Sequence, residues 1–428
     1  MLGNLRCLLP AGALDLAVWE ARAHKELQDL QHQQQTAATA LEQLAATAAT
    51  ATTRQRLESL VAGYAGQLEC LHSILAPLLA GRASSDRATY NALHTPGLLD
   101  STTLFSYTTN LFRDWVWGEA ENHQALAMLT NVAPGALGRT LVLGAGGGRL
   151  AWDLASGPAS EVYAVDINPF TSSVAATLSS GTSVPLWEFP LAPISTADVA
   201  IHRTLAAADP TPNFDPTALT FLLADARALP FTAASFDTVV TPWFTDVVQT
   251  TPAAVSAQIN QLLVAGGRWL NFGSVAFADA DPSRCLLLTE LLELVQTQGF
   301  ANPKVTEQLG PYLCSPHSRY GRQELLHAFA ATKEQSAKHT PAQARPANSE
   351  TTGVDWLSNT SKPIPALTQF QDQALATQVH AYLLSLIDGK RSIDAIADIL
   401  QQRKLLSARE AVPVIQGFLE KMLPQNQN

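Results

Sequence analysis

Residues 140–150 read TLVLGAGGGRL, and residues 151–155, AWDLA, follow them directly. The first four residues predict a short apolar strand, the glycine run predicts a tight loop, and residues 151–155 predict a helix. Glycine lets the backbone turn sharply and approach a ligand closely, and the amino end of a helix presents free N–H groups. This order of strand, glycine loop and helix predicts a nucleotide-binding site.

The next predicted strand supports that interpretation. Residues 161–165, EVYAV, form an apolar run that ends at Asp166. An acidic side chain about 20 residues after a glycine loop is placed to accept hydrogen bonds from a ribose diol. A glycine loop alone occurs in several classes of nucleotide-binding enzyme, so the downstream sequence must distinguish between them.

Three further segments continue the alternation of strands and helices. Residues 221–231, FLLADARALPF, predict a strand that ends at Asp225 and is followed by a loop, and residues 235–241, SFDTVVT, predict a buried strand. Within the second strand, Asp237 is expected to tie the strand to a turn. Residues 262–272, LLVAGGRWLNF, predict a helix end, a Gly-Gly turn and another strand. This alternation is typical of a parallel sheet covered by helices.

This ordered set of segments resembles the class I S-adenosylmethionine-dependent methyltransferases, over roughly half of the chain. The resemblance implies an α/β fold with a Rossmann-like methyltransferase sheet, S-adenosylmethionine as the cofactor, and no metal. It also implies cofactor contacts, in which glycines line the methionine portion, one acid holds the ribose, and an Asp-Ala pair meets the adenine edge: Gly144, Gly146, Gly148, Asp166, Asp225 and Ala226.

Three stretches are similar to the carnosine N-methyltransferase family, which methylates an imidazole nitrogen of a histidine-containing dipeptide. They are Arg113-Asp114-Trp115, residues 146–152 (GGGRLAW) and residues 266–273 (GGRWLNFG). The resemblance implies that Arg113 holds the cofactor carboxylate, and a guanidinium is a natural partner for a carboxylate. Residues 247–249 and 274–277 depart from that family's acceptor-binding elements. The substrate contacts are therefore not carried over, and a small imidazole- or amine-containing acceptor is the leading hypothesis.

The loop after the strand at 235–241 is expected to lie beside the transferred methyl group, because it follows the carboxyl end of a strand. It reads PWFTDVV over residues 242–248. Trp243 and Phe244 either wall the acceptor site or pack in the core. Asp246 either orients the acceptor and takes its proton, which makes it a catalytic candidate, or caps a helix.

Residues 311–320, PYLCSPHSRY, interrupt the last two predicted strands. Tyr312 and His317 are the leading catalytic candidates in this loop, with Tyr320 as a further candidate, because a phenol or an imidazole could orient the acceptor and accept its proton. The alternative is an ordinary hairpin connection.

Composition and periodicity divide the chain into four parts. The periodicity of the N-terminal region predicts two long helices, with the Ala/Thr-rich residues 36–53 near their junction. These helices either form a cap or a dimer element, or pack as part of the scaffold. We expect a helical N-terminal region, an S-adenosylmethionine-binding domain, a linker and a small winged-helix-like domain, at residues 1–130, 131–335, 336–365 and 366–428.

Residues 381–400 predict a helix, a turn and a second helix, since Asp388-Gly389 ends the first and Ser392 can cap the second. This C-terminal element resembles the winged-helix PqqD proteins of pyrroloquinoline quinone biosynthesis. Related domains bind leader peptides, so the resemblance implies either peptide recognition or a structural module.

The bulk composition excludes several classes. A formal net charge of −10 disfavours nucleic-acid binding, and 46% hydrophobic residues supply a sizeable core. The four cysteines have no metal-ligand spacing and predict free thiols. No signal peptide or membrane span is expected, which indicates a cytoplasmic protein.

Three functions remain open from the sequence. The first is a methyltransferase acting on a small molecule, the second is a peptide-modifying methyltransferase that grips a leader with its C-terminal domain, and the third is a non-catalytic binding protein that keeps the nucleotide fold. The expected partner is accordingly a small-molecule or peptide acceptor, with a homodimer as a further alternative.

Overall fold

The computed structural model describes two compact units, residues 1–342 and 343–428, which are treated separately. The described residues are 5–8, 16–44, 50–80, 104–105, 107–207, 215–248, 250–277 and 282–337 in the first unit, and 361, 363, 366, 368–403 and 405–422 in the second. Most of the predicted linker at 336–365 lies outside them.

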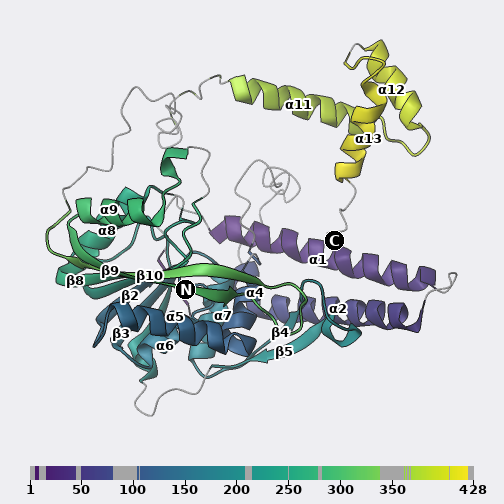
Figure 1. Cartoon of the computed structure of the whole chain (residues 1–428). Helices are drawn as coiled ribbons and strands as arrows, with labels where there is room; N and C mark the ends of the chain where they lie inside the picture. The colour runs from purple at the N-terminus through teal and green to yellow at the C-terminus, as the bar shows by residue number, and fades with distance from the viewer. Residues whose placement is uncertain are drawn as a thin grey trace. The chain divides into compact units, whose positions relative to one another are not determined.

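The first unit is built on an eight-stranded sheet in the order β1-β6-β3-β2-β7-β8-β10-β9 (Figure 1). The pairs from β1 to β8 are all parallel, whereas β10 is antiparallel to both β8 and β9. The strands are β1 (Arg6–Cys7), β2 (Gly138–Leu143), β3 (Ala159–Asp166), β6 (Leu219–Leu223), β7 (Phe236–Pro242), β8 (Leu263–Gly273), β9 (Phe300–Tyr312) and β10 (Arg322–Lys333). The predicted α/β class with a Rossmann-like sheet is confirmed.

Helices cover both faces of this sheet, because its central strands are apolar on both sides. In β2, Leu141 and Leu143 belong to one buried cluster and Val142 to the other, as alternation along a strand requires. The helices of the first unit's main body are α4 (Thr108–Phe112), the π-helical turn η2 (Arg113–Trp117), α5 (Glu119–Val132), α6 (Arg149–Ala155), α7 (Pro169–Ser179), α8 (Pro252–Leu262) and α9 (Leu288–Thr297).

The strand order places a crevice at the end of β2. From β2 the chain moves outward through β3 to β6, and it then returns to add β7 on the other side of β2. The register pairs Val142 of β2 with Val240 of β7, so the loops that follow both strands leave the sheet at the same edge. Ligands bind at such a switch point in open α/β sheets.

Two long helices precede the sheet domain, α1 (Leu16–Gln43) and α2 (Ala51–Leu79). The break between them falls inside the Ala/Thr-rich stretch 36–53, as predicted. A small hairpin of β4 (Val184–Glu188) and β5 (Ile201–Leu205) lies against α2, where Gln67 Oε1 accepts a hydrogen bond from Trp187 N at 2.7 Å.

One local expectation is wrong in detail. The Gly-Gly pair at 266–267 does not end a helix, since α8 already ends at Leu262 and β8 runs through the pair. Gly266 instead bends the strand with a φ of +75°.

The second unit consists of α11 (Thr368–Ser385), α12 (Ile393–Gln402) and α13 (Ala411–Met422). Ser392 caps α12 as predicted, since its side chain accepts a hydrogen bond from Ala395 N at 3.2 Å. The helices share a small core that includes Leu383, Leu400 and Ile415. The described part of this unit contains no strand, so the wing of the winged-helix expectation stays a prediction.

Within the described residues, no helix is both long and apolar enough to span a membrane. The same residues contain no group of three or more His, Cys, Asp or Glu side chains arranged to hold a metal ion.

Candidate cofactor and acceptor site

The glycine loop between β2 and α6 is held in left-handed backbone conformations. Gly144, Gly146 and Gly148 have φ values of +73°, +54° and +85°. Residues other than glycine adopt these backbone conformations only at a cost in free energy. Gly144 N and Ala145 N both donate to Val165 O, at 2.9 and 3.0 Å. The loop is therefore fixed against the end of β3.

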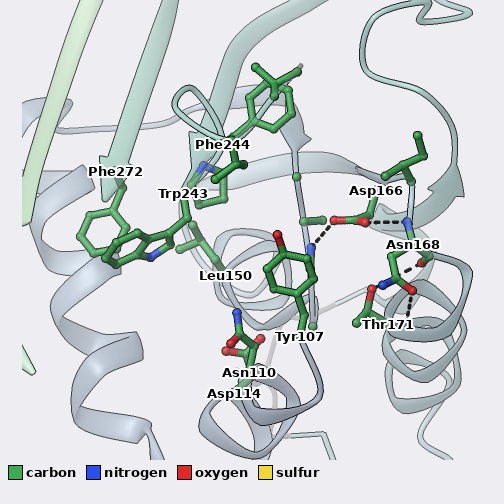
Figure 2. Close-up of a pocket in the computed structure, with 18 of the residues that line it drawn as sticks. Tyr107, Asn110, Asp114, Leu150, Asp166, Asn168, Thr171, Trp243, Phe244 and Phe272 are labelled. Atoms are coloured by element: carbon green, nitrogen blue, oxygen red, sulfur yellow. Dashed lines mark hydrogen bonds between the residues drawn. The ribbon is translucent and has the colours of Figure 1, made fainter. Parts of the chain in front are cut away.

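Asp166 ends β3 and joins the glycine loop to the next helix. Its carboxylate accepts a hydrogen bond from Gly146 N and another from Asn168 N, each at 2.8 Å (Figure 2). Burial raises the pKa of Asp166, and these two N–H groups act in the opposite direction. Each carboxylate oxygen keeps a further acceptor site that can face the cavity.

Asn168 is a site residue that was not predicted. It caps α7 by accepting a hydrogen bond from Phe170 N at 2.9 Å, and its Nδ2 donates to Leu104 O at 2.9 Å. The available signal was Asn before Pro169, which combines a preferred N-cap with proline at the first helical position.

The Arg-Asp-Trp element forms the π-helical turn η2 and packs on the glycine loop. Trp115 Nε1 donates to Gly147 O at 2.8 Å, and the guanidinium of Arg149 donates to Asp114 O at 2.9 Å. Arg113 Nε and Nη2 lie 2.8 and 2.6 Å from Asp114 Oδ1. A side chain at Gly147 would collide with the Asp114 carboxylate. The element and the loop thus form one rigid wall.

A cavity of about 450 Å³ opens along this wall. Eight of the ten predicted site residues line it: Arg113, Gly144, Gly146, Asp166, Asp225, Ala226, Asp246 and Tyr312. Gly148 and His317 are not among the lining residues. The volume falls in the range of roughly 300–1,000 Å³ that is typical of small-molecule sites.

Gly148 has a packing role in this structure. A Cβ at this position would lie 2.7 Å from the Ala175 side chain and 2.8 Å from the Phe221 ring. The third glycine of the loop lets helix and strand approach closely, which is the role that the third glycine has in nucleotide loops.

His317 lies on the loop between β9 and β10 and faces the β4–β5 hairpin. Its Nδ1 is 2.7 Å from Asp198 Oδ1, within hydrogen-bond distance. The sequence could not indicate this partner, because Asp198 is 119 positions away.

Asp225 lines the same cavity and is paired with Arg227. Arg227 Nη2 is 2.7 Å from Asp225 Oδ2, and Arg227 N donates to Oδ1 at 2.8 Å. Burial acts to raise the pKa of Asp225, but the hydrogen bonds from Arg227 outweigh it and the pKa lies below its usual value. The carboxylate is therefore ionised and oriented.

Aromatic rings build the other end of the cavity. The rings of Trp243 and Tyr312 lie 4.5 Å apart, and Trp243 meets Phe272 edge-on at 5.9 Å (Figure 2 shows Trp243 and Phe272 side by side). Trp243 has a φ of +49°, and its backbone N–H donates a hydrogen bond to Phe272 O at 2.8 Å. The indole of Trp243 therefore lines the cavity and at the same time packs against the neighbouring buried cluster.

Asp246 follows this aromatic wall. Its Oδ2 accepts a hydrogen bond from Ala276 N at 3.0 Å, so it anchors the residues after β8 instead of capping a helix. Burial raises the pKa of Asp246, which makes its carboxylate a better proton acceptor than an exposed one.

Two acids, of which Glu121 is half-buried and Glu188 is buried, hold the β9–β10 loop at this end. Glu121 accepts hydrogen bonds from Leu313 N and Cys314 N, both at 3.1 Å. Glu188, which is 3% exposed, accepts from Trp117 Nε1 at 3.0 Å and from Ser315 at 3.1 Å. The loop is therefore a fixed part of the site.

Comparison with known proteins gives one family match. Residues 141–270, which are under a third of the chain, match the family model described as "Methyltransferase domain". No curated protein matches the chain.

Several solved structures are similar to the chain. YcgJ from Bacillus subtilis has 16% identity and a TM-score of 0.34, over 50% of this chain and 99% of that one. Phosphoethanolamine N-methyltransferase 2 of Haemonchus contortus, in complex with phosphomonomethylethanolamine and S-adenosylhomocysteine, has 16% identity and a TM-score of 0.35. The alignment covers 56% of this chain and 61% of that one. The N-methyltransferase NodS of Bradyrhizobium japonicum, in complex with S-adenosylhomocysteine, has 12% identity and a TM-score of 0.35. The alignment covers 54% of this chain and 97% of that one.

The matched segment contains the glycine loop, Asp166, Asp225 and the aromatic turn at Trp243. The loop offers backbone N–H groups and open space at Gly146, where an added Cβ would meet no atom within 4 Å. The carboxylates of Asp166 and Asp225, which follow strand ends, line the same cavity. Residues 141–270 therefore form an S-adenosylmethionine-dependent methyltransferase domain.

Proposed function

We propose that this enzyme transfers the methyl group of S-adenosylmethionine to a nitrogen of a small imidazole- or amine-containing acceptor. The observation that carries the proposal is the continuity of one cavity, from the glycine loop and Asp166 to a wall of Trp243, Tyr312 and Asp246. Aromatic faces beside a carboxylate favour a group that becomes cationic when it is methylated.

The cofactor placement follows from the donors and acceptors along the cavity. Gly144 and Gly146 would lie under the methionine portion, Asp166 would accept hydrogen bonds from the ribose hydroxyls, and Asp225 with Ala226 would meet the adenine edge. Arg113 would hold the aminoacyl carboxylate. The bound cofactor supplies an electrophilic methyl group on a sulfonium.

The chain's own residues would position the acceptor. A neutral imidazole or amine nitrogen attacks in line, so orientation and exclusion of water supply much of the rate enhancement. Asp246 would accept the N–H of the acceptor and hold it toward the methyl group. The proton released from the product nitrogen would pass to this carboxylate, whose raised pKa suits it to that step. Tyr312 and Trp243 would stabilise the developing positive charge.

The similarity to carnosine N-methyltransferases supports an imidazole acceptor, although the family's acceptor residues are replaced here. The PqqD-like interpretation of residues 366–428 supports a peptide acceptor instead. The small-molecule proposal is favoured because the described lining residues of the first unit already supply an aromatic wall and a carboxylate for the acceptor. The four cysteines, which are free thiols, agree with a reducing, cytoplasmic location.

An acceptor panel tests this proposal. The full chain is incubated with S-adenosylmethionine and, in separate reactions, histidine, histidine dipeptides, histamine, aliphatic amines, phenols and thiols, and formation of S-adenosylhomocysteine is measured. Turnover restricted to imidazoles or amines is expected. Turnover restricted to oxygen or sulfur nucleophiles would contradict the nitrogen assignment while leaving the methyltransferase domain intact.

A further inference from the structure

Helix α1 brings an unsatisfied hydrogen-bond donor to the cavity. Trp19 lines the cavity and is 1% exposed, and its Nε1 is buried without a hydrogen-bond partner in the described chain. An indole N–H can only donate, and leaving such a group buried and unpaired costs about 1–3 kcal/mol. Buried polar groups are nearly always paired, so the indole N–H indicates an acceptor on a bound molecule.

Arg22 lies one turn further along α1 and lines the same cavity. Its guanidinium carbon is 4.9 Å from the centre of the Trp19 ring. Among the described residues no acid forms an ion pair with Arg22. A guanidinium stacked on a ring keeps its N–H groups free to donate at its edge, so Trp19 and Arg22 form one donor pair.

Glu26, on the next turn of α1, fixes the part of the helix that carries this donor pair. Glu26 accepts hydrogen bonds from Leu104 N at 2.5 Å and Phe105 N at 3.0 Å. Leu104 O in turn accepts a hydrogen bond from Asn168, which is bonded to Asp166. Helix α1 is therefore tied to the same loop that carries the ribose-binding acid of the proposed site.

The charge balance along the cavity distinguishes Arg22 from Arg113. The Nε and Nη2 of Arg113 are bound to Asp114, so this pair presents little net positive charge. Arg22 carries a positive charge that no described carboxylate neutralises. A carboxylate has about four acceptor positions and can bind donors from both arginines.

We propose that the Trp19 indole N–H and the Arg22 guanidinium bind the aminoacyl carboxylate of S-adenosylmethionine, so that helix α1 is part of the cofactor site. This inference rests on the proposed function, and it assigns the N-terminal helices a role in binding beyond that of a scaffold. An anionic group on the acceptor would satisfy the same donors, and the test separates these two sources.

The test compares two ligands that differ only in the aminoacyl portion. S-adenosylhomocysteine carries the carboxylate, whereas 5′-methylthioadenosine keeps the adenosine and lacks it. Both are titrated calorimetrically into the full chain and into Trp19→Phe, which keeps a ring and removes the N–H, and Arg22→Gln, which removes the charge. Arg54→Gln, on an exposed position of α2, is the control.

Each variant is expected to bind S-adenosylhomocysteine about tenfold more weakly, because a hydrogen bond to a charged group is lost. Its affinity for 5′-methylthioadenosine should not change, and Arg54→Gln should match the unmodified chain. Unchanged affinity for S-adenosylhomocysteine in both variants would overturn the proposal and leave an acceptor anion as the ligand of this pair. Equal weakening of both ligands would also overturn it. Failure of the unmodified chain to bind either ligand would contradict the proposed function instead.

A second readout follows the indole directly. Among the eight tryptophan indole signals in a ¹⁵N spectrum, the Trp19 signal is the one missing from Trp19→Phe. S-adenosylhomocysteine should shift this signal, and 5′-methylthioadenosine should not. A Trp19 signal that does not respond to S-adenosylhomocysteine would refute the contact even if both variants bound weakly.

Discussion

Replacement of Asp166 should separate its contacts with the glycine loop from its proposed role in binding the ribose. Its carboxylate accepts one N–H from Gly146 and one from Asn168, each at 2.8 Å. In Asp166→Asn the amide oxygen keeps one of these bonds and the amide nitrogen faces the other donor. One backbone N–H loses its partner, which costs about 1–3 kcal/mol, and relief from burying a charge offsets part of that.

The expected stability loss is therefore small, near 1 kcal/mol, or a fall in Tm of about 2–4 °C. The effect on cofactor binding should be larger. Hydrogen bonds from hydroxyls to an ionised carboxylate contribute about 1.5–3 kcal/mol, so Kd should rise about 10- to 150-fold. Asp166→Ala should show at least the same loss of affinity and a larger fall in Tm, because both backbone donors lose their partner.

Calorimetric titration with S-adenosylhomocysteine and thermal unfolding without ligand measure the two effects. Glu161→Gln is the matched control, since Glu161 lies on the same strand but is 42% exposed and pairs with Arg139. The control should bind with unchanged affinity. Full affinity in Asp166→Ala would refute the placement of the ribose, and full affinity with an unchanged Tm would refute the described loop contacts as well.

Four further outcomes are expected. Gly148→Ala should destabilise the fold by about 2–5 kcal/mol in urea unfolding, because a left-handed backbone strains alanine and the added Cβ overlaps its neighbours. Gly181 has a φ of +82° and open space around it, so Gly181→Ala should show the backbone strain alone. Equal losses of stability in the two variants would contradict the packing role of Gly148. Burial lowers the pKa of His327 from 6.5 to about 4. The neutral imidazole therefore contributes fully to the free energy of unfolding above pH 6.5, and the free energy of unfolding should fall by about 3 kcal/mol as pH falls toward 4. The same pH dependence in a His327→Gln variant would contradict this expectation. Asp246→Asn should lower kcat/KM about 100-fold and leave affinity for S-adenosylhomocysteine unchanged, as expected for loss of a general base; unchanged turnover would remove Asp246 from the chemistry. A chain ending at Ala342 should keep small-molecule turnover, because the cavity lies in the first unit; loss of turnover in a folded truncation would favour the peptide-modifying alternative.

The local part of the fold and site could be predicted from the sequence. Residues 140–155 and Asp166 follow rules that involve neighbours along the chain, such as glycine turns, strand alternation and acids at strand ends. The resemblance added Arg113, Asp225 and Ala226, which the structure brings to the same cavity.

The remaining features depend on contacts between distant segments. Trp19 and Arg22 reach the cavity because α1 is tied to Leu104, 78 positions from Glu26. The polar loop and the imidazole of His317 predict a substrate contact, whereas the contact with Asp198 arises from the fold and leaves the catalytic role of His317 a prediction. No local pattern encodes such pairings, since they depend on which loops the sheet order brings together.

The cavity beside the glycine loop is expected to bind S-adenosylmethionine. Equilibrium titration of the full chain with S-adenosylmethionine and, separately, with NAD measures this binding. We expect binding of S-adenosylmethionine in the micromolar range, which is common for enzyme ligands, and no binding of NAD. Binding of NAD alone, or of neither compound, would contradict it.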